Sequence, residues 1–309
     1  MKNNKHAAGH LLATLTIIIW GTTFISTKIL LRDFTPIEIL FYRFTIGLLT
    51  LILIYPRRLK ITNMKQEITY ACAGLCGLTL YYLLENIALT YSMASNISVI
   101  ISIAPLFTAL FASRFLSGER LKINFFIGFV TAITGIFLIS FQGSSEIKVN
   151  PIGDFMALLA AAVWAVYSVL TKKISVYGHH TIQTTKRIFF YGILFMIPAL
   201  FIFDFKLGPE RFQSPVNLFN ILFLSLGASA MCFVTWNYAV KVLGAVKTSI
   251  YIYITPVITV ITSVIILHEV ITGVLVAGAL LTMAGLFISK SEIGLKKKLS
   301  HIKIQKTEQ

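Results

Sequence analysis

The chain has 309 residues, of which 56% are apolar and only 13% are charged, whereas a soluble domain usually contains about 25% charged residues. This composition excludes a water-soluble globular protein, because such a fold must cover its surface with polar groups. The net charge of +15 does not indicate a nucleic-acid partner, because Lys and Arg collect in the loops between apolar runs, where the positive-inside rule places them.

Long apolar runs dominate the chain from residue 11 to residue 289. Their length of about 20 residues suits an α-helix that crosses a bilayer, whereas strands of outer-membrane barrels are about ten residues long and alternate in polarity. The sequence therefore predicts an all-α polytopic membrane protein with ten transmembrane helices. Cut at charged and turn-forming segments, the predicted helices cover 11–31, 36–55, 67–89, 94–115, 121–141, 152–171, 183–203, 217–238, 245–267 and 270–289.

The distribution of positive charge predicts how the helices are oriented. Loops on the side of the N-terminus contain 21 Lys and Arg residues, and loops on the opposite side contain five. Because Lys and Arg accumulate in cytoplasmic loops, both termini are predicted to be cytoplasmic, and residues 290–309 to form a basic cytoplasmic tail. The predicted location is the cell membrane, with membrane lipids as partners.

Uncommon residues recur at nearly constant spacing in the two halves, first at an offset of 144 and then at an offset of 151. The chain is therefore predicted to be a duplicated five-helix unit, residues 1–141 and 142–289. Because five is odd, the second unit enters the membrane from the opposite side, and such inverted repeats are typical of transporters that work by alternating access. The aligned pairs include Trp20 with Trp164, Lys28 with Lys172, Arg43 with Arg187, Asn86 with Asn237, and Pro105 with Pro256.

Four stretches are distinctive: "WGTTFISTKILL" (20–31), P-x-E-x-x-x-x-R-F (36–44), "APLFTALFASRFLSGERL" (104–121) and G-x-x-x-x-x-x-G (128–135). Together they resemble the EamA-type transporters of the drug/metabolite transporter superfamily, and the resemblance covers nearly the whole chain. It implies a ten-helix fold whose central cavity is lined mainly by the first, third, fourth, sixth, eighth and ninth helices. Through this cavity, amino acids or related metabolites would leave the cell. The second half departs from the pattern, with an alanine where the first half has Gly21.

Few charged residues lie inside the predicted helices. Lys28 and Lys172 lie at the outer end of the first helix and the inner end of the sixth, where they either snorkel to the interface or form symmetric gates that salt-bridge when their side is closed. Arg43 lies about 10 Å inside the second helix, and a charge at that depth needs a partner or a water-filled cavity. Glu85 is its predicted partner in an ion pair that is either structural or functional, and Glu38 lies nearer the surface.

Aromatic and amide side chains near the helix centres are further candidates. Aromatic residues either line an apolar cavity or anchor helices at the interface, and Asn86 and Asn237 hydrogen-bond either between helices or to substrate. Pro105 and Pro256 are predicted to free a carbonyl and kink the fourth and ninth helices, and Glu269 is predicted to stabilise a helix N-terminus. The predicted cavity residues are Trp20, Tyr81, Tyr82, Glu85, Asn86, Trp164, Tyr167, Trp236, Asn237 and Tyr253.

The predicted function is secondary transport that exports amino acids or related small metabolites by alternating access. Because few charges lie within the membrane, the cavity suits a neutral or zwitterionic solute with an apolar part. A carrier of phosphorylated solutes, such as sugar phosphates, would need clustered Lys and Arg in the cavity, and a channel would not need two moving halves. A membrane-embedded enzyme is disfavoured, because no P-loop, metal-ligand or nucleophile motif occurs. No metal or other cofactor is predicted, and the chain is a monomer or a homodimer.

Overall fold

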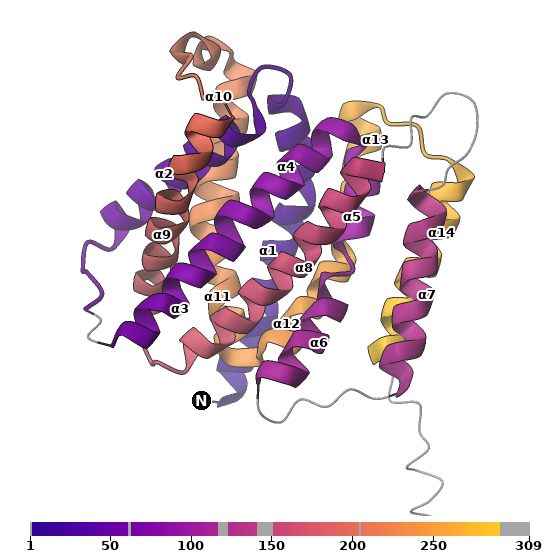
Figure 1. Cartoon of the computed structure of the whole chain (residues 1–309), viewed down its shortest axis with the longest axis horizontal. Coiled ribbons are helices and arrows are strands. Elements are labelled where there is room, and N and C mark those ends of the chain that lie inside the picture. Colours follow the sequence, from indigo (N-terminus) through magenta and orange to yellow (C-terminus); the bar gives the residue numbers. More distant parts are fainter. Residues whose placement is uncertain (1, 61–62, 117–122, 141–150, 204, 291–309) are drawn as a thin grey trace, which may run out of the picture.

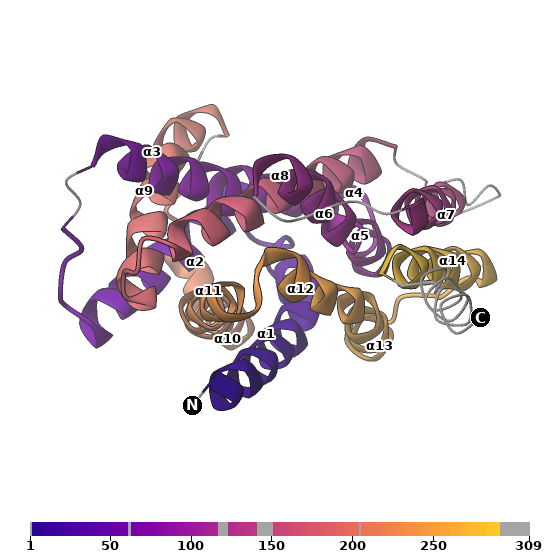
Figure 2. The same cartoon turned by 90° about the horizontal axis from the view of Figure 1, so that it is seen from below.

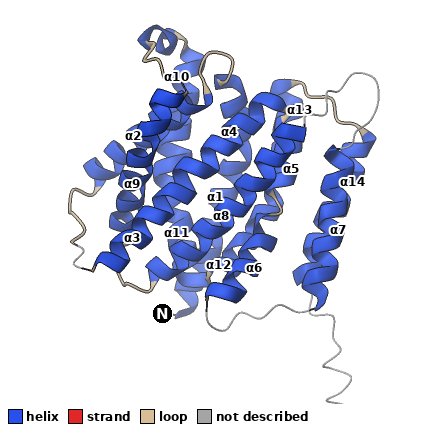
Figure 3. Cartoon of the chain, viewed as in Figure 1, coloured by secondary structure: helices blue, strands red, loops and turns tan. Residues whose placement is uncertain are grey.

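The computed structural model describes residues 2–60, 63–116, 123–140, 151–203 and 205–290. In this part of the chain all regular secondary structure is helical and no strand occurs (Figures 1 and 3). Eight helical segments are long and apolar enough to cross a membrane. The prediction of an all-α polytopic membrane protein is thereby confirmed.

The eight long segments coincide with eight of the ten predicted helices. Four of them are unbroken, and four are built from shorter pieces. The unbroken ones are α1 (Lys2–Leu30), α2 (Pro36–Ile54), α8 (Pro151–Ser175) and α9 (Thr181–Ile202). The composite ones are α3 (Met64–Gly74), η1 (Leu75–Leu80) and α4 (Tyr81–Tyr91); α5 (Ala94–Ile101) and α6 (Ala104–Phe115); α10 (Pro215–Leu222), η3 (Phe223–Met231) and α11 (Cys232–Leu243); and α12 (Ala245–Ser249), η4 (Ile250–Ile254) and α13 (Thr255–Leu267), with the short η2 (Pro209–Gln213) preceding α10.

The fifth and tenth predicted helices correspond to α7 (Ile123–Ser140) and α14 (Gly273–Lys290). Their described apolar stretches, Ile123–Gly135 and Gly273–Gly285, are shorter than the eight long segments. These two helices lie side by side at one edge of the bundle, in both views of the molecule (Figures 1 and 2).

Glycines allow the backbones of α7 and α14 to approach closely. A Cβ atom on Gly285 would lie 2.4 Å from the amide nitrogen of Ala132 and 2.5 Å from the carbonyl oxygen of Gly128. A Cβ atom on Gly135 would lie 2.6 Å from the carbonyl oxygen of Gly278. Small residues at such crossings permit the van der Waals packing that holds helices together in a membrane.

Replacing Gly285 by Ala is expected to lower thermal stability, because the added methyl group meets backbone atoms that cannot move independently. Overpacking of this kind typically costs about 1–3 kcal/mol. Gly273→Ala is the matched control, since a Cβ atom there meets nothing within 4 Å. Thermal unfolding of the two purified variants in detergent measures the difference, and equal melting temperatures would contradict the close crossing.

Irregular helical segments occur at equivalent places in the two halves. The π-helices η1 and η3 end at Leu80 and Met231, which are 151 residues apart. Farther along, α6 starts at Ala104 after a break, and α13 starts at Thr255 after the 3₁₀-helix η4; these starts are also 151 residues apart. π-Helical turns and 3₁₀ stretches inside helices often mark functional sites or hinges. The two π-helices, the break before α6 and the 3₁₀-helix η4 therefore indicate which part of the molecule contains the functional site.

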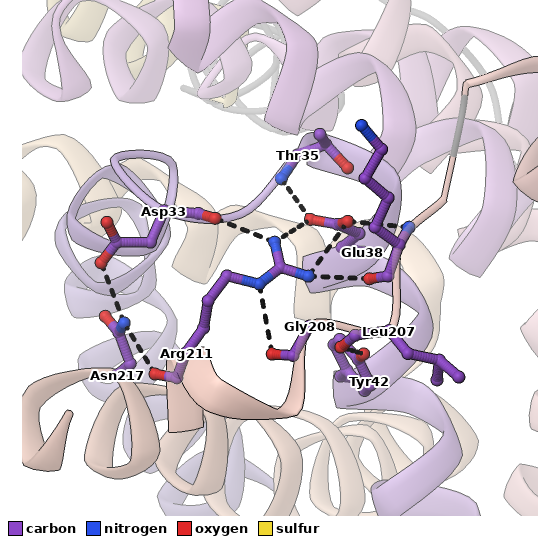
Figure 4. Close-up of polar contacts among 9 residues, drawn as sticks. Asp33, Thr35, Glu38, Tyr42, Leu207, Gly208, Arg211 and Asn217 are labelled. Carbon is purple, nitrogen blue, oxygen red and sulfur yellow. Dashed lines mark hydrogen bonds and ion pairs between the residues drawn. The ribbon is translucent and has the colours of Figure 1, made fainter. Parts of the chain in front are cut away.

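A polar network ties the turn between α1 and α2 to the connection between α9 and α10 (Figure 4). Arg211 in η2 donates to the Glu38 carboxylate from Nη1 at 2.7 Å and from Nη2 at 3.2 Å, and to the carbonyl oxygen of Asp33 at 2.9 Å. The same carboxylate accepts the backbone N–H of Thr35 at 2.8 Å and that of Lys206 at 3.0 Å. The hydrogen bonds to Glu38 raise the pKa of the Arg211 guanidinium above its ordinary value.

Candidate functional site

A small cavity lies where three of the four composite segments meet α1 and α8. Its volume is about 30 Å³, which is room for only one or two water molecules, so the cavity as it stands is too small for an amino acid. The lining residues are Ile17, Trp20, Thr23, Phe24, Tyr81, Tyr82, Glu85, Ile101, Trp164, Ile252 and Thr255.

Residues that the repeat aligns meet at this cavity. The rings of Trp20 on α1 and Trp164 on α8, which are aligned by the offset of 144, are in edge contact with 5.2 Å between centroids. Ile101 at the end of α5 and Ile252 in η4, which are aligned by the offset of 151, also both line the cavity. Residues at matching offsets in the two halves of the chain therefore line or border one site.

Five of the lining residues are aromatic, and four of these five rings pack against one another and against neighbouring aromatic residues. The ring centroid of Tyr81 lies 4.8 Å from that of Trp164 and 4.7 Å from that of Tyr82. The ring centroid of Trp236 lies 5.1 Å from that of Trp20. The indole N–H of Trp20 donates to a backbone carbonyl at 2.9 Å. The indole nitrogens of Trp164 and Trp236 are buried without a hydrogen-bond partner in the described part of the chain. Such buried donors are uncommon in native proteins.

Glu85 is the one charged residue that lines the cavity. It follows Tyr81 by one helical turn on α4, which places both residues on the same face of the helix. Glu85 is only 1% exposed, and among the described residues its Oε1 atom has no hydrogen-bond partner. A buried carboxylate oxygen without a partner is costly, so this oxygen is available to a ligand.

The predicted ion pair between Arg43 and Glu85 is not formed. Arg43 is fully buried, and its Nε atom donates to the Ser229 hydroxyl at 3.0 Å. Its guanidinium carbon lies 4.3 Å from the ring centroid of Tyr82 and 5.1 Å from that of Phe44, so cation–π contact replaces the predicted salt bridge. Neither Nη atom has a hydrogen-bond partner among the described residues, and Glu85 acts on Arg43 only through longer-range electrostatics.

Five of the ten predicted cavity residues line the cavity, and five do not. Asn237 accepts from the Tyr167 hydroxyl at 2.8 Å and donates to Thr185 at 3.1 Å, and Asn86 donates to the carbonyl oxygen of Pro36 at 3.1 Å. These bonds link neighbouring helices, as interhelical amides do in membranes. The five residues outside the lining are Asn86, Tyr167, Trp236, Asn237 and Tyr253.

Lys28 and Glu269 form hydrogen bonds to the turn that joins α4 to α5. The Lys28 ammonium donates to the carbonyl oxygens of Leu89 and Ser92, near the end of α4. The Glu269 carboxylate accepts the backbone N–H of Ala94 at 2.8 Å and the hydroxyl of Ser95 at 2.6 Å. Glu269 therefore does stabilise a helix N-terminus, but that of α5 rather than that of the helix it precedes.

Lys172, which is the other predicted gate residue, and the predicted kink residues Pro105 and Pro256 do not line the cavity. Lys172 is half-buried near the end of α8 and forms no ion pair with any described residue. Pro105 and Pro256 are the second residues of α6 and α13. Pro105 follows the break between α5 and α6, and Pro256 follows the 3₁₀-helix η4. Each therefore lies in the first turn of its α-helix, where proline is well tolerated.

Six lining residues were not predicted from the sequence. Helical spacing could have indicated Ile17, Thr23 and Phe24, which lie three or four residues from Trp20 on α1. Ile101 and Ile252 could have been found from the repeat, because each lies four residues before one of the aligned prolines. Thr255 carries no such signal apart from its place directly before Pro256.

The sequence profile described as "EamA-like transporter family" matches the chain twice, over residues 7–141 and 151–290. The chain belongs to the EamA-like transporter family. It is therefore a transporter and not an enzyme, as the sequence motifs predicted.

Relatives of this EamA-like transporter align along nearly its whole length. An uncharacterized transporter of Archaeoglobus fulgidus is 30% identical, with 92% of this chain and 97% of the relative covered. A protein of Streptantibioticus cattleyicolor named "Probable terminal-alkyne amino-acid exporter" is 25% identical, with 93% and 95% covered. A solved crystal structure matches with a TM-score of 0.64 at 20% identity, covering 92% of this chain and 96% of the other, which shows that the two share a fold.

Proposed function

We propose that this transporter is a secondary carrier that exports amino acids or related small metabolites bearing an amino group. The observation that carries the proposal is Glu85, a single carboxylate with an unpartnered oxygen in a cavity otherwise lined by aromatic, aliphatic and hydroxyl side chains. A substrate ammonium would bind this carboxylate and the faces of the surrounding rings, since aromatic faces attract cations. The naming of one relative as an amino-acid exporter supports the same substrate class.

The rest of the cavity fits an amino acid better than a phosphorylated solute. No Lys or Arg is among the lining residues, whereas phosphate recognition normally uses several cations. Arg43, behind Tyr82, supplies one positive charge with two unpartnered Nη atoms. Glu85 in the cavity lining and Arg43 against the Tyr82 ring provide one anionic and one cationic group, which match the two charges of a zwitterion.

We propose that transport proceeds by alternating access in a ten-helix fold with two inverted five-helix repeats. A cavity of about 30 Å³ must open toward each side in turn to admit a solute. The equal spacing of the helix interruptions in both halves and the contact between Trp20 and Trp164 support two equivalent moving units. Exchanging the conformations of such units reverses the side on which the cavity opens.

A counterflow assay tests this function. The protein is reconstituted in liposomes loaded with one unlabelled amino acid, and uptake of the labelled amino acid is measured. A carrier gives saturable, transient accumulation, whereas a channel gives neither. Comparing the metabolites exported by overexpressing and deletion strains selects the amino acids to load. Absence of counterflow for every amine so selected would overturn the proposal.

The proposed location is the cytoplasmic membrane, with both termini in the cytoplasm. The expected result for a reporter fused after Gln309 is activity only for a reporter that works in the cytoplasm. The reason is the excess of Lys and Arg, 21 against five, in loops on the side of the N-terminus. Activity of a periplasmic or extracellular reporter at that position would contradict the orientation and the inversion argument.

Pro105→Ala and Pro256→Ala are each expected to slow transport more than they lower the amount of folded protein. Pro105 follows the break before α6, and Pro256 follows the 3₁₀-helix η4. Replacing either proline permits a continuous α-helix that resists bending. Counterflow rates normalised to protein recovered by size-exclusion chromatography measure the effect. Unchanged rates in both variants would leave the prolines a packing role only.

A further inference from the structure

A groove lies between α2 and α9, where α2 ends and α9 begins. Its volume is about 400 Å³, within the range of about 300–1,000 Å³ typical of ligand sites. The two helices lie next to each other in both views (Figures 1 and 2) and come from different halves of the chain. The groove is separate from the central cavity and shares none of its lining residues.

The loop that follows α2 is fixed on the first turns of α9. The Lys186 ammonium donates to the carbonyl oxygens of Tyr55 and Arg57, the latter at 2.9 Å. The Gln183 amide donates to the carbonyl oxygen of Arg58 at 3.1 Å. Arg58 therefore lines the groove from a loop whose backbone is already held in place, which lowers the entropy lost when a ligand binds.

Positive charge predominates at the rim of the groove. Arg58, Lys186 and Arg187 all line it. Arg187 forms an ion pair with Glu67, but its Nε atom is buried without a hydrogen-bond partner in the described part of the chain. Neither Arg58 nor Lys186 forms an ion pair with a described acidic residue. Charge-assisted hydrogen bonds from such groups favour a phosphate or carboxylate.

The wall of the groove is apolar and faces outward from the bundle. Leu48 and Ile52 of α2 and Phe190 of α9 line it, with Ile52 42% and Phe190 48% exposed. Because these residues belong to membrane-spanning segments, their exposed faces contact acyl chains. An apolar wall beside a cationic rim matches the two parts of a phospholipid, whereas a soluble anion would use only the rim.

We propose that this groove binds an anionic phospholipid, with its phosphate at Arg58, Lys186 and Arg187 and its glycerol and upper acyl chains along α2 and α9. Basic pockets between transmembrane helices bind anionic headgroups in this way. The inference does not depend on the transported solute, and it holds for a carrier of any substrate class. The lipid would join two helices that belong to opposite repeats.

Native mass spectrometry of the detergent-purified protein tests the site with short-chain phosphatidylglycerol as the probe. Arg58→Gln is the test variant, because among the described residues only the main-chain oxygen of Arg58, and not its side chain, takes part in a hydrogen bond, so the fold should persist. Arg57→Gln is the matched control, with the same charge change in the same loop but outside the groove lining. Loss of one cation at a lipid headgroup is expected to weaken phosphatidylglycerol binding about fivefold in Arg58→Gln and to leave Arg57→Gln close to wild type.

Two further probes distinguish the lipid from other ligands. Short-chain phosphatidylcholine is expected to bind more weakly than phosphatidylglycerol, and glycerol 3-phosphate at equal concentration is expected not to displace the lipid. Equal losses in Arg57→Gln and Arg58→Gln would show general surface attraction and overturn the site. Equal binding of phosphatidylcholine, or displacement by glycerol 3-phosphate, would overturn the assignment of an anionic lipid as the occupant.

Discussion

Replacing Arg211 by Ala is expected to abolish most of the folded protein. The change leaves the Glu38 carboxylate, which is 1% exposed, without its bidentate partner. Removing one member of a buried ion pair typically costs about 3–5 kcal/mol. Because the Arg211 side chain is itself 19% exposed, we expect a loss toward the lower end of this range, which is still a large share of the roughly 5–15 kcal/mol that stabilises a typical protein. Arg32→Ala is the matched control, because Arg32 is an exposed cation in the turn at the end of α1. Folded yield is measured by fluorescence-detected size-exclusion chromatography.

A double variant separates the pair from the rest of its network. Glu38→Leu combined with Arg211→Leu removes both charges but also removes the acceptor for the backbone N–H groups of Thr35 and Lys206. We therefore expect only partial recovery of folded yield relative to Arg211→Ala. Full recovery would show that these backbone hydrogen bonds contribute little, and wild-type yield in Arg211→Ala would show that Glu38 does not need its partner. An arginine guanidinium stays charged at every pH at which folding is assayed, and the hydrogen bonds to Glu38 raise the pKa of Arg211 further.

The helices could be predicted from the sequence because length and polarity determine them. In lipid, every backbone N–H and C=O group must find its hydrogen-bond partner within the segment. An apolar run of about 20 residues therefore forms a helix, because a helix satisfies all of these groups. The fine structure could not be predicted in this way. The π-helices η1 and η3 lie within runs such as "LCGLTL", whose composition does not differ from that of an ordinary α-helix.

The partners of the buried charged residues could not be predicted from the sequence. Helical rise places Arg43 and Glu85 at similar depth, but depth does not say which way a side chain points around its helix axis. Arg43 contacts Tyr82, which lies three residues before Glu85 on the same helix. The actual partner of Glu38 is 173 residues away, in a connection between helices, and no local pattern in the sequence encodes that contact.

The central tryptophans were predicted from a different kind of signal. Trp20 and Trp164 are uncommon residues that are separated by the offset of 144, and an inverted repeat would bring such a pair together near its pseudo-two-fold axis. The structure brings their rings into contact. The remaining lining residues are ordinary Ile, Thr and Phe side chains, which only the three-dimensional arrangement distinguishes from other core residues.

Glu85→Gln is expected to lower the transport of amino-group substrates by about 10–100-fold without loss of folded protein. The substitution keeps the shape of the side chain but removes the charge, and a hydrogen bond to a charged group is typically worth about 1.5–3 kcal/mol. Glu210→Gln is the matched control, since it makes the same change on an exposed residue of η2. Liposome counterflow with an amino acid, and with its deaminated carboxylate analogue, measures both rate and specificity.

The specificity of the loss decides what Glu85 does. If the carboxylate binds the substrate ammonium, Glu85→Gln should depress counterflow of the amino acid and leave any counterflow of the deaminated analogue unchanged. An equal loss for both solutes would assign Glu85 a structural role, and an unchanged rate for the amino acid would remove it from the site. The double variant Arg43→Met with Glu85→Leu adds a second test. Because these residues form no direct ion pair, removing both charges should restore no transport, whereas recovery of transport would mean that their only task is to balance each other's charge in the membrane.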